Sequence, residues 1–212
     1  MSEKDIERVI RYHLEPINIS FQAMNPELRC KMLHNRFAGK ALDKVDMLYN
    51  AGITMNGQIV LCKGVNDGDE LEYSLEKLSA YAPVLQSVSV VPVGLTKYRE
   101  GLYPLEPFNK EDAEKIIDSY QKHLKPIAYE LVFDNDEKET LRLIQKVRDS
   151  GARLFVNSLW PKLCGGHDDD RAVELHQPDE SWGWIIAQGA KLIQTDRPTL
   201  LLEYLRNKKL HD

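Results

Sequence analysis

Residues 58–68 read QIVLCKGVNDG, and this stretch decides the fold class. The β-rich run Ile53–Cys62 ends within this stretch, and a polar loop that contains glycine follows it. A helical pattern then extends over Asp69–Ala82. A further β-rich run begins at Gln86. The order strand, loop, helix and strand is typical of a βαβ unit, in which the two strands run parallel.

The same alternation extends along the chain. Six strands are predicted, at Pro16–Gln22, Ile53–Cys62, Gln86–Val93, Ile127–Phe133, Ala152–Asn157 and Lys191–Thr195. Helices are predicted at Pro26–Gly52, Asp69–Ala82, Asn109–Leu124, Asp136–Ser150, Ser181–Gly189 and Pro198–Lys208. Glycine stands where three of these helices should end, at Gly52, Gly151 and Gly189. The chain is therefore predicted to be an α/β protein with a parallel sheet or a barrel.

Composition argues against several classes of function. The 212 residues are 42% hydrophobic, which is enough for a substantial core. The formal charge of −5 comes from 28 basic and 33 acidic side chains, which is too weak and too mixed to favour a nucleic-acid partner. The N-terminal residues are charged, and no apolar run approaches the length of a membrane span. We therefore expect a cytoplasmic protein without a membrane partner.

Three cysteines, Cys30, Cys62 and Cys164, are far apart in the sequence and form no CxxC pair. An odd number at such spacing does not indicate a disulfide framework or a metal site. They are predicted to be reduced thiols that pack as small hydrophobic side chains.

The loops at the carboxyl ends of the strands are where a parallel α/β fold binds its ligand. Lys63, Lys97 and Arg99 lie in such loops beside glycines. Side-chain charge and free amides there are typical of a phosphate or carboxylate site. The alternative is that they are solvated cations close to acidic residues of the same loops, and this simpler interpretation is favoured for each of them taken alone.

Residues from about 4 to 118 resemble the later part of the catalytic barrel of a bacterial radical S-adenosylmethionine (SAM) family that carries an uncharacterised C-terminal domain. The matching motifs are Ile19-Ser20, Asn25-Pro26-Glu27-Leu28-Arg29, residues 58–68 and Val91-Pro92-Val93-Gly94-Leu95-Thr96-Lys97-Tyr98-Arg99. The resemblance implies a cluster held by three closely spaced cysteines, and this chain has no such group. No iron–sulfur cluster is therefore expected. Gln22 also stands where the resemblance implies a histidine.

Residues from about 126 to 208 resemble the C-terminal end of glycerophosphodiester phosphodiesterases, which are (β/α)8 barrels. The matching motifs are Tyr129-Glu130-Leu131-Val132-Phe133, Val156-Asn157-Ser158-Leu159-Trp160, Gly165-Gly166-His167-Asp168-Asp169-Asp170-Arg171-Ala172 and Ile193-Gln194-Thr195-Asp196-Arg197-Pro198. In that family a divalent cation polarises the phosphodiester and histidines act as acid and base. The His-Arg-Gly motif that would carry those histidines does not occur in this chain.

This resemblance leaves the closing wall of a phosphodiesterase site in the chain. The residues are Asn157, Trp160 and Arg197 as candidate phosphate ligands, and Glu130, His167, Asp168 and Asp196 as candidate ligands of Mg²⁺ or Ca²⁺. No resident cofactor is expected, and a divalent cation is the alternative.

The run His167-Asp168-Asp169-Asp170 is rich in the oxygen ligands that hard cations prefer. Adjacent residues cannot all face one ion, however, so an Asp-rich loop that caps the following turn or stays solvated is favoured. Trp182 and Trp184 are interpreted as packing residues of a short helix.

The resemblance changes between about Asp118 and Pro126, and no Gly/Ser-rich linker separates the two parts. We therefore predict one chimeric barrel-like domain over residues 1–212, built from segments 1–124 and 125–212. Its roughly six parallel βα units are about two fewer than a TIM barrel needs, which predicts an incomplete or partly open barrel. A recombined or engineered chain, a natural fusion and a truncated gene product would all fit.

The function predicted from the sequence is a barrel-derived scaffold without either parent's catalytic activity, which binds phosphate or another small phosphorylated ligand weakly. The alternative is a metal-dependent phosphodiester hydrolase that uses Glu130, His167, Asp168, Asp196 and Arg197. A third alternative is a structural module whose open sheet edge recruits a second copy. A homodimer is expected because six parallel strands leave unpaired edges.

Overall fold

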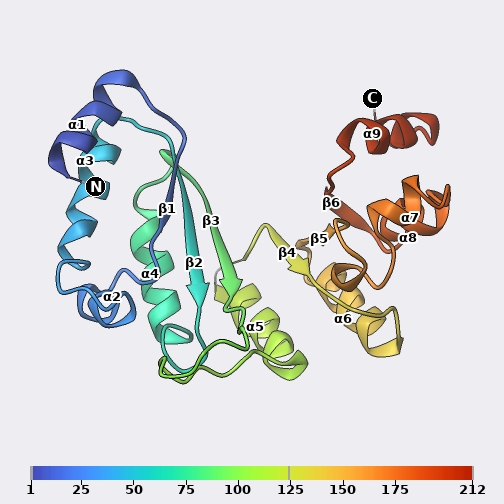
Figure 1. Cartoon of the computed structure of the whole chain (residues 1–212), viewed down its shortest axis with the longest axis horizontal. Helices are drawn as coiled ribbons and strands as arrows, with labels where there is room; N and C mark the ends of the chain where they lie inside the picture. The colour runs from blue at the N-terminus through green and yellow to red at the C-terminus, as the bar shows by residue number, and fades with distance from the viewer. Residues whose placement is uncertain (1, 124, 212) are drawn as a thin grey trace. The chain divides into compact units, whose positions relative to one another are not determined.

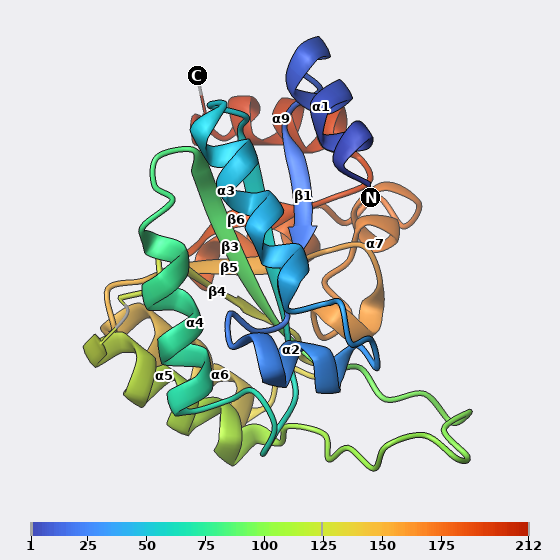
Figure 2. The same cartoon turned by 90° about the vertical axis from the view of Figure 1, so that its left-hand side faces the viewer.

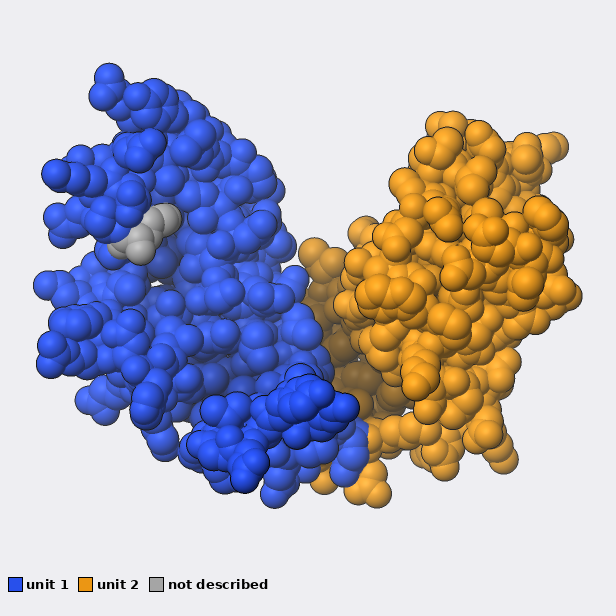
Figure 3. Space-filling model, in the orientation of Figure 1, with its two compact units in different colours: residues 1–109 blue, residues 110–212 orange. Residues whose placement is uncertain are grey.

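A computed structural model describes residues 2–123 and 125–211. The chain divides into two compact units, Met1–Asn109 and Lys110–Asp212, which are coloured separately in Figure 3. No helix in the described part of the chain combines the length and the apolar character that a membrane crossing requires.

The first unit is a three-stranded parallel sheet with helices packed on one face (Figures 1 and 2). Its strands, in hydrogen-bonded order, are β1 (Ile17–Ser20), β2 (Met55–Leu61) and β3 (Leu85–Pro92). Its helices are α1 (Glu3–Tyr12), α2 (Pro26–Met32), the 3₁₀ helix η1 (Lys40–Leu42), α3 (Asp43–Asn50) and α4 (Asp69–Ser79). Met55, Ile59 and Leu61 of β2 are buried, and burial of their apolar area stabilises this layer.

The opposite face of the β1–β3 sheet is mostly polar and largely exposed to solvent. The strand register sets its side chains in three rows: Asn18, Asn56 and Ser87, then Ser20, Gln58 and Ser89, and last Val60 and Val91. Within the first row the Ser87 hydroxyl lies 2.9 Å from Oδ1 of Asn56 and donates to it. We call this side the open face of the first unit.

The second unit repeats the same plan. Its strands are β4 (Ala128–Leu131), β5 (Arg153–Asn157) and β6 (Ala190–Gln194), which are parallel and ordered β4-β5-β6. Its helices are α5 (Lys110–His123), α6 (Lys138–Asp149), η2 (Pro161–Leu163), α7 (Asp169–Val173), the π-helix η3 (Asp179–Gly183), α8 (Trp184–Ala187) and α9 (Pro198–Asn207).

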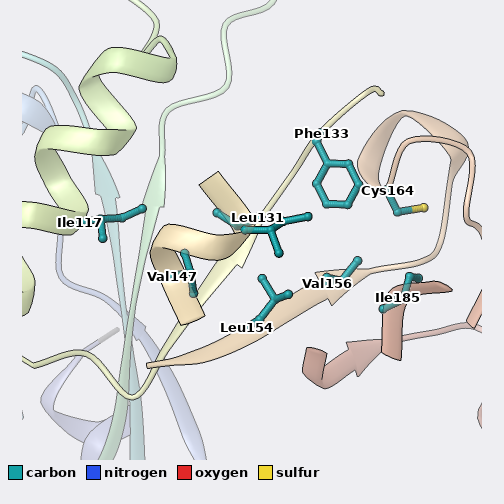
Figure 4. Packing of buried hydrophobic residues seen from close by; sticks show 9 residues of the cluster. Ile117, Leu131, Phe133, Val147, Leu154, Val156, Cys164 and Ile185 are labelled. Carbon is teal, nitrogen blue, oxygen red and sulfur yellow. The ribbon is translucent and has the colours of Figure 1, made fainter. Parts of the chain in front are cut away.

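The core of the second unit lies between one face of its sheet and the helices α5, α6 and α8 (Figure 4). Its buried members are Ile117, Leu131, Phe133, Ile144, Val147, Leu154, Val156, Cys164 and Ile185. The alternation along β5 is strict, because Leu154 and Val156 are each 1% exposed while Arg153 and Phe155 point to the other side. The apolar side chains on one face of this sheet therefore pack against the helices, and the other face does not take part in this core.

All six predicted strands are confirmed, each within two residues of its predicted bounds. The predicted glycine stops are also confirmed, because Gly52, Gly151 and Gly189 follow α3, α6 and α8 with φ of 71°, 83° and 91°. Such left-handed conformations carry little cost only for glycine. The described residues form two three-stranded sheets and no closed barrel, so the α/β class is confirmed and a barrel origin stays a prediction.

The predicted long helix Pro26–Gly52 is wrong. Helix α2 ends at Met32, His34 takes a left-handed φ of 49°, and a helical path resumes only at Lys40. Gly39 approaches α2 so closely that a Cβ on it would lie 2.8 Å from the Pro26 carbonyl oxygen. The chain breaks here because this close contact folds the segment back on itself.

Three other helical segments differ from the sequence prediction. Helix α1 was not predicted, although Ser2 and Asp5 form a capping box in which each side chain accepts from the backbone N–H of the other. Helix α7 was not predicted, and the predicted helix Ser181–Gly189 begins instead as the π-helix η3 at Asp179. The predicted end of the helix Asn109–Leu124 lies outside the described residues.

Three tyrosines make the fold sensitive to alkaline pH. The pKa of Tyr81, Tyr129 and Tyr204 is raised to about 12, and burial is the largest cause in each case. Tyr81 also donates to Asp46 at 2.7 Å and Tyr204 to Asp179 at 2.6 Å, and both carboxylates disfavour the phenolate.

Because an unfolded tyrosine ionises near about pH 10, the unfolded state loses these protons first. We therefore expect the free energy of unfolding to be unaffected by these groups below about pH 10 and to fall as the pH rises toward 12. Urea unfolding at a series of alkaline pH values measures this fall, and replacing the three tyrosines by Phe should flatten it. An equal slope in the wild type and the triple variant would contradict the assignment.

Candidate functional site

Asn66 organises the carboxyl ends of β1 and β2 in the first unit. Its side chain is 1% exposed, and its Oδ1 accepts from the backbone N–H of Cys62 at 2.7 Å. Its Nδ2 donates to the carbonyl oxygens of Gln22 at 2.7 Å and Val60 at 3.0 Å. The Gln22 side chain in turn accepts from the Val60 N–H at 2.8 Å, just beyond the end of β1. Gln22, with a left-handed φ of 65°, thus has a structural role at this strand end.

Two of the predicted basic residues lie at this same end of the sheet. Burial raises the pKa of the Cys62 thiol, and the positive charge of Arg99 opposes that rise. Arg99 therefore lies near Cys62, which directly precedes Lys63. The Lys63 ammonium is 3.9 Å from the Glu106 carboxylate, a long and exposed ion pair that is worth little.

Lys97 and Arg99 both belong to the segment between β3 and α5. The Lys97 ammonium lies 5.1 Å from the centre of the Tyr98 ring, and Tyr98 is 78% exposed. Arg99 donates from Nη2 to the carbonyl oxygen of Tyr103 at 2.7 Å. This segment therefore carries two cations and an exposed aromatic ring.

The neighbouring hollow between α2 and α4 is acidic. It has a volume of about 640 Å³ and is lined by Asn25, Pro26, Glu27, Asp69, Glu70 and Tyr73. Glu70 accepts from Asn25 Nδ2 at 3.0 Å through Oε1, while its buried Oε2 has no hydrogen-bond partner among the described residues. Three carboxylates repel an anion, so this hollow does not suit the predicted phosphate ligand.

Asp169 ties together the strand ends of the second unit, and sequence reasoning missed it. Its carboxylate is 2% exposed. Oδ1 accepts from the Ser158 hydroxyl at 2.7 Å and from Trp182 Nε1 at 2.9 Å. Oδ2 accepts from the Thr195 hydroxyl and from the Asp196 N–H, both at 2.8 Å. Four donors on one buried carboxylate make a rigid junction between the loops after β5 and β6.

His167, a candidate metal ligand, is buried at 6% exposure. Its Nδ1 lies 2.6 Å from the carbonyl oxygen of Glu180, and its Nε2 lies 3.3 Å from Oδ2 of Asp136. The ring stacks on Trp184 at a centroid distance of 3.8 Å. Both ring nitrogens are therefore used inside the unit.

Asp168 is the N-cap of α7. Its Oδ1 accepts from the backbone N–H groups of Asp170 at 3.1 Å and Arg171 at 3.2 Å. The prediction that the Asp-rich run caps the following turn is thereby confirmed. The packing role predicted for the tryptophans is also confirmed, since Trp182 is 2% exposed and Trp184 packs against the core.

The remaining candidates at the ends of β5 and β6 are dispersed. The Arg197 guanidinium lies 3.4 Å from Glu174 and 3.8 Å from Asp170, which offset its charge. Asn157 donates to Gln194 Oε1 at 3.1 Å, and Trp160 after β5 is 61% exposed.

The structure does not bring the four candidate metal ligands together. Glu130 is exposed on β4, and Asp196 contacts Asp169 through its backbone N–H. Within residues 2–123 and 125–211, no three His, Cys, Asp or Glu side chains form a group that could hold a metal ion.

The cysteines are free thiols. Cys62 and Cys164 are buried, as predicted, whereas Cys30 is only partly buried and its sulfur accepts from the Gly39 N–H at 3.2 Å. Burial raises the pKa of Cys164 to about 12, so this thiol stays protonated and unreactive at neutral pH.

Comparison with protein-family models matches residues 1–88 to a radical SAM-like domain and residues 103–205 to a domain of unknown function. No curated protein matches the chain. Among solved structures, a radical SAM methyltransferase from Sphaerobacter thermophilus is similar at 19% sequence identity, with a TM-score of 0.36. The similarity covers 76% of this chain and 40% of that enzyme, so the chain spans well under half of its length. A TM-score this low carries no argument about a shared fold.

These matches bear differently on the two resemblances. The second, to glycerophosphodiester phosphodiesterases, finds no support and stays a prediction, because its segment matches only a domain of unknown function. That match begins at residue 103, before the predicted change of resemblance at Asp118–Pro126. The first resemblance is confirmed at a coarse level: residues 1–88 are similar to a radical SAM-like domain.

Proposed function

We propose that this protein is a barrel-derived scaffold, related in its first part to radical SAM domains, that carries out neither radical chemistry nor phosphodiester hydrolysis. One observation carries the second half of this proposal: the candidate metal ligands His167 and Asp168 are used in internal hydrogen bonds. Opening a metal site there would break the cap of α7 and the His167 contacts. The wide separation of the cysteines in the sequence supports the absence of a cluster.

We further propose that the scaffold binds a small phosphorylated ligand weakly at the strand ends of the first unit. Arg99 lies near Cys62, which is the residue before Lys63 in the sequence. Lys97 belongs to the same segment as Arg99. A guanidinium with one N–H bonded to a carbonyl keeps further donors for a phosphate oxygen. Asn157, Trp160 and Arg197 form the second candidate set, which is weaker because Glu174 and Asp170 already offset the charge of Arg197.

The hydrolase alternative has one observation in its favour. Glu130 and Asn157 lie on the same face of the β4–β6 sheet, where a polar ligand has access. It lacks an acid–base pair, however, because His167 is buried against Trp184.

Phosphorus NMR of a glycerophosphodiester titrated with the protein follows binding and hydrolysis together. We expect the ligand resonance to broaden with a dissociation constant of about 1 mM, as for one or two exposed charge contacts. The double variant Lys97→Ala/Arg99→Ala should remove the broadening, while Lys138→Ala, an exposed lysine on α6, should leave it unchanged. With Mg²⁺ or Ca²⁺ no product resonance should appear.

Two other outcomes of this titration would change the proposed site or the proposed function. Broadening that survives Lys97→Ala/Arg99→Ala but disappears in Arg197→Ala would move the site to the second unit. A product resonance that disappears in Glu130→Ala would replace the scaffold proposal by the hydrolase.

A further inference from the structure

The side of the β4–β6 sheet that faces away from the core of the second unit has a distinct chemistry. Register and alternation place on it Ala128 and Glu130 of β4, Arg153, Phe155 and Asn157 of β5, and Leu192 and Gln194 of β6. We call this side the open face of the second unit. Phe155 lies at its centre, on the middle strand, between Glu130 and Leu192 in the same row.

The open face of the second unit carries opposite charges around an apolar centre. Glu130 and Arg153 are both exposed, and Leu192 is 37% exposed. Val132, the residue that follows β4, is 60% exposed. Within residues 2–123 and 125–211, neither the Glu130 carboxylate nor the Arg153 guanidinium has a hydrogen-bond or ion-pair partner. A face with an unpaired acid, an unpaired base and an aromatic centre is complementary to itself.

We propose that the open face of the second unit is a docking surface for a second copy of this chain, in which Glu130 of each copy pairs with Arg153 of the other. A two-fold interface requires such self-complementarity, because each contact occurs twice. The open face of the first unit fits this surface less well, since its Asn, Ser and Gln rows and its Val60–Val91 row carry no charge for Glu130 or Arg153. Charge complementarity thus favours the same face of another copy.

The spacing of the residues fits this pairing. Glu130 lies one strand away from Phe155, which is about 4.8 Å, and Arg153 lies two residues away along β5, which is about 6.6 Å. A two-fold axis that passes near Phe155 and runs diagonally between these two directions sets each Glu130 opposite Arg153 of the other copy. The strands of the two copies then cross at nearly a right angle, which is one of the two common arrangements of packed sheets.

The dimer is expected to be weak. The open face of the second unit consists of only three strands of four or five residues each. Such a face is smaller than the surface of about 800 Å² that each partner buries in a stable complex. We therefore expect a concentration-dependent equilibrium, in which the weight-average mass rises from 24.4 kDa toward twice that value.

Sedimentation equilibrium over a wide concentration range tests the proposal with a charge-swap cycle. Glu130→Arg and Arg153→Glu should each raise the dissociation constant at least about tenfold, because each sets two like charges together at both symmetric contacts. The double variant Glu130→Arg/Arg153→Glu should return it to within about threefold of the wild type. Gln58→Arg, at an exposed position on the open face of the first unit, is the matched control and should have no effect.

Other occupants of the face give different results. A wild-type mass of 24.4 kDa at every concentration overturns the proposal, including the case in which another part of the same chain covers the face. Association that is unchanged in both single variants assigns the dimer to a sheet edge instead, and failure of the double swap to restore it rules out the Glu130–Arg153 pair. Far-UV circular dichroism confirms that each variant is folded.

Discussion

Replacing Asp169 by Ala is expected to lower the free energy of unfolding of the second unit by about 3–5 kcal/mol. The variant leaves the Thr195 hydroxyl, the Trp182 indole N–H and the Asp196 backbone N–H without their acceptor, while the Ser158 hydroxyl still has the Gln194 carbonyl oxygen at 2.8 Å. These donors are held in a site where Asp169 itself is 2% exposed, so water replaces the lost bonds poorly. Urea unfolding followed by tryptophan fluorescence measures the change selectively, because all three tryptophans belong to this unit.

Asp170→Ala is the matched control for that experiment. Asp170 is the adjacent carboxylate on α7, but it is exposed, and its ion pair with Arg197 spans 3.8 Å. Such a pair is worth less than about 1 kcal/mol. Asp169→Asn should fall between the two, since the amide keeps one acceptor oxygen. Equal loss of stability in Asp169→Ala and Asp170→Ala would show that the Asp169 junction contributes nothing special.

Replacing Asn66 by Ala is expected to cost the first unit about 2–4 kcal/mol. The amide N–H of Cys62 and the carbonyls of Gln22 and Val60 all lose their partner at once. The loss can be measured by urea unfolding with circular dichroism, and hydrogen exchange should show faster exchange of the Cys62 amide. That local change reports on the strand end even if the variant remains folded.

Asn56→Ala gives the corresponding control in the same unit. Asn56 lies on the open face, and its amide oxygen accepts only one hydroxyl, that of Ser87. Its replacement should cost less than about 1 kcal/mol. If Asn66→Ala were no more destabilising than Asn56→Ala, the hydrogen bonds of Asn66 to the strand ends would add nothing to the free energy of unfolding.

Local sequence alone determined the framework of this protein. Most strands are short runs in which apolar residues alternate with polar ones, as in Arg153–Asn157, and glycine ends helices where the chain must take a positive φ, as at Gly151. Both are properties of a few neighbouring residues, so periodicity predicts them. The N-cap at Asp168 belongs to the same class, because its partners are two and three residues away.

Long-range contacts decided what the sequence could not. The break after Met32 depends on Gly39 meeting Pro26, an approach that helix propensity does not encode. The choice among the adjacent aspartates is of the same kind. Asp168 caps α7, Asp169 turns inward and Asp170 stays exposed, because successive helical residues point in different directions.

The candidate site shows the same division. The sequence singles out His167, Asp168 and Asp196 as candidate metal ligands, because their side chains carry oxygen or nitrogen donor atoms. It does not single out Asp169 or Asn66 as site residues. Asp169 takes its donors from residues 11 to 27 positions away, and Asn66 takes one of its acceptors from 44 positions away. Only the tertiary structure decides which polar groups meet, because a buried polar side chain is stable only where the fold brings enough partners to it.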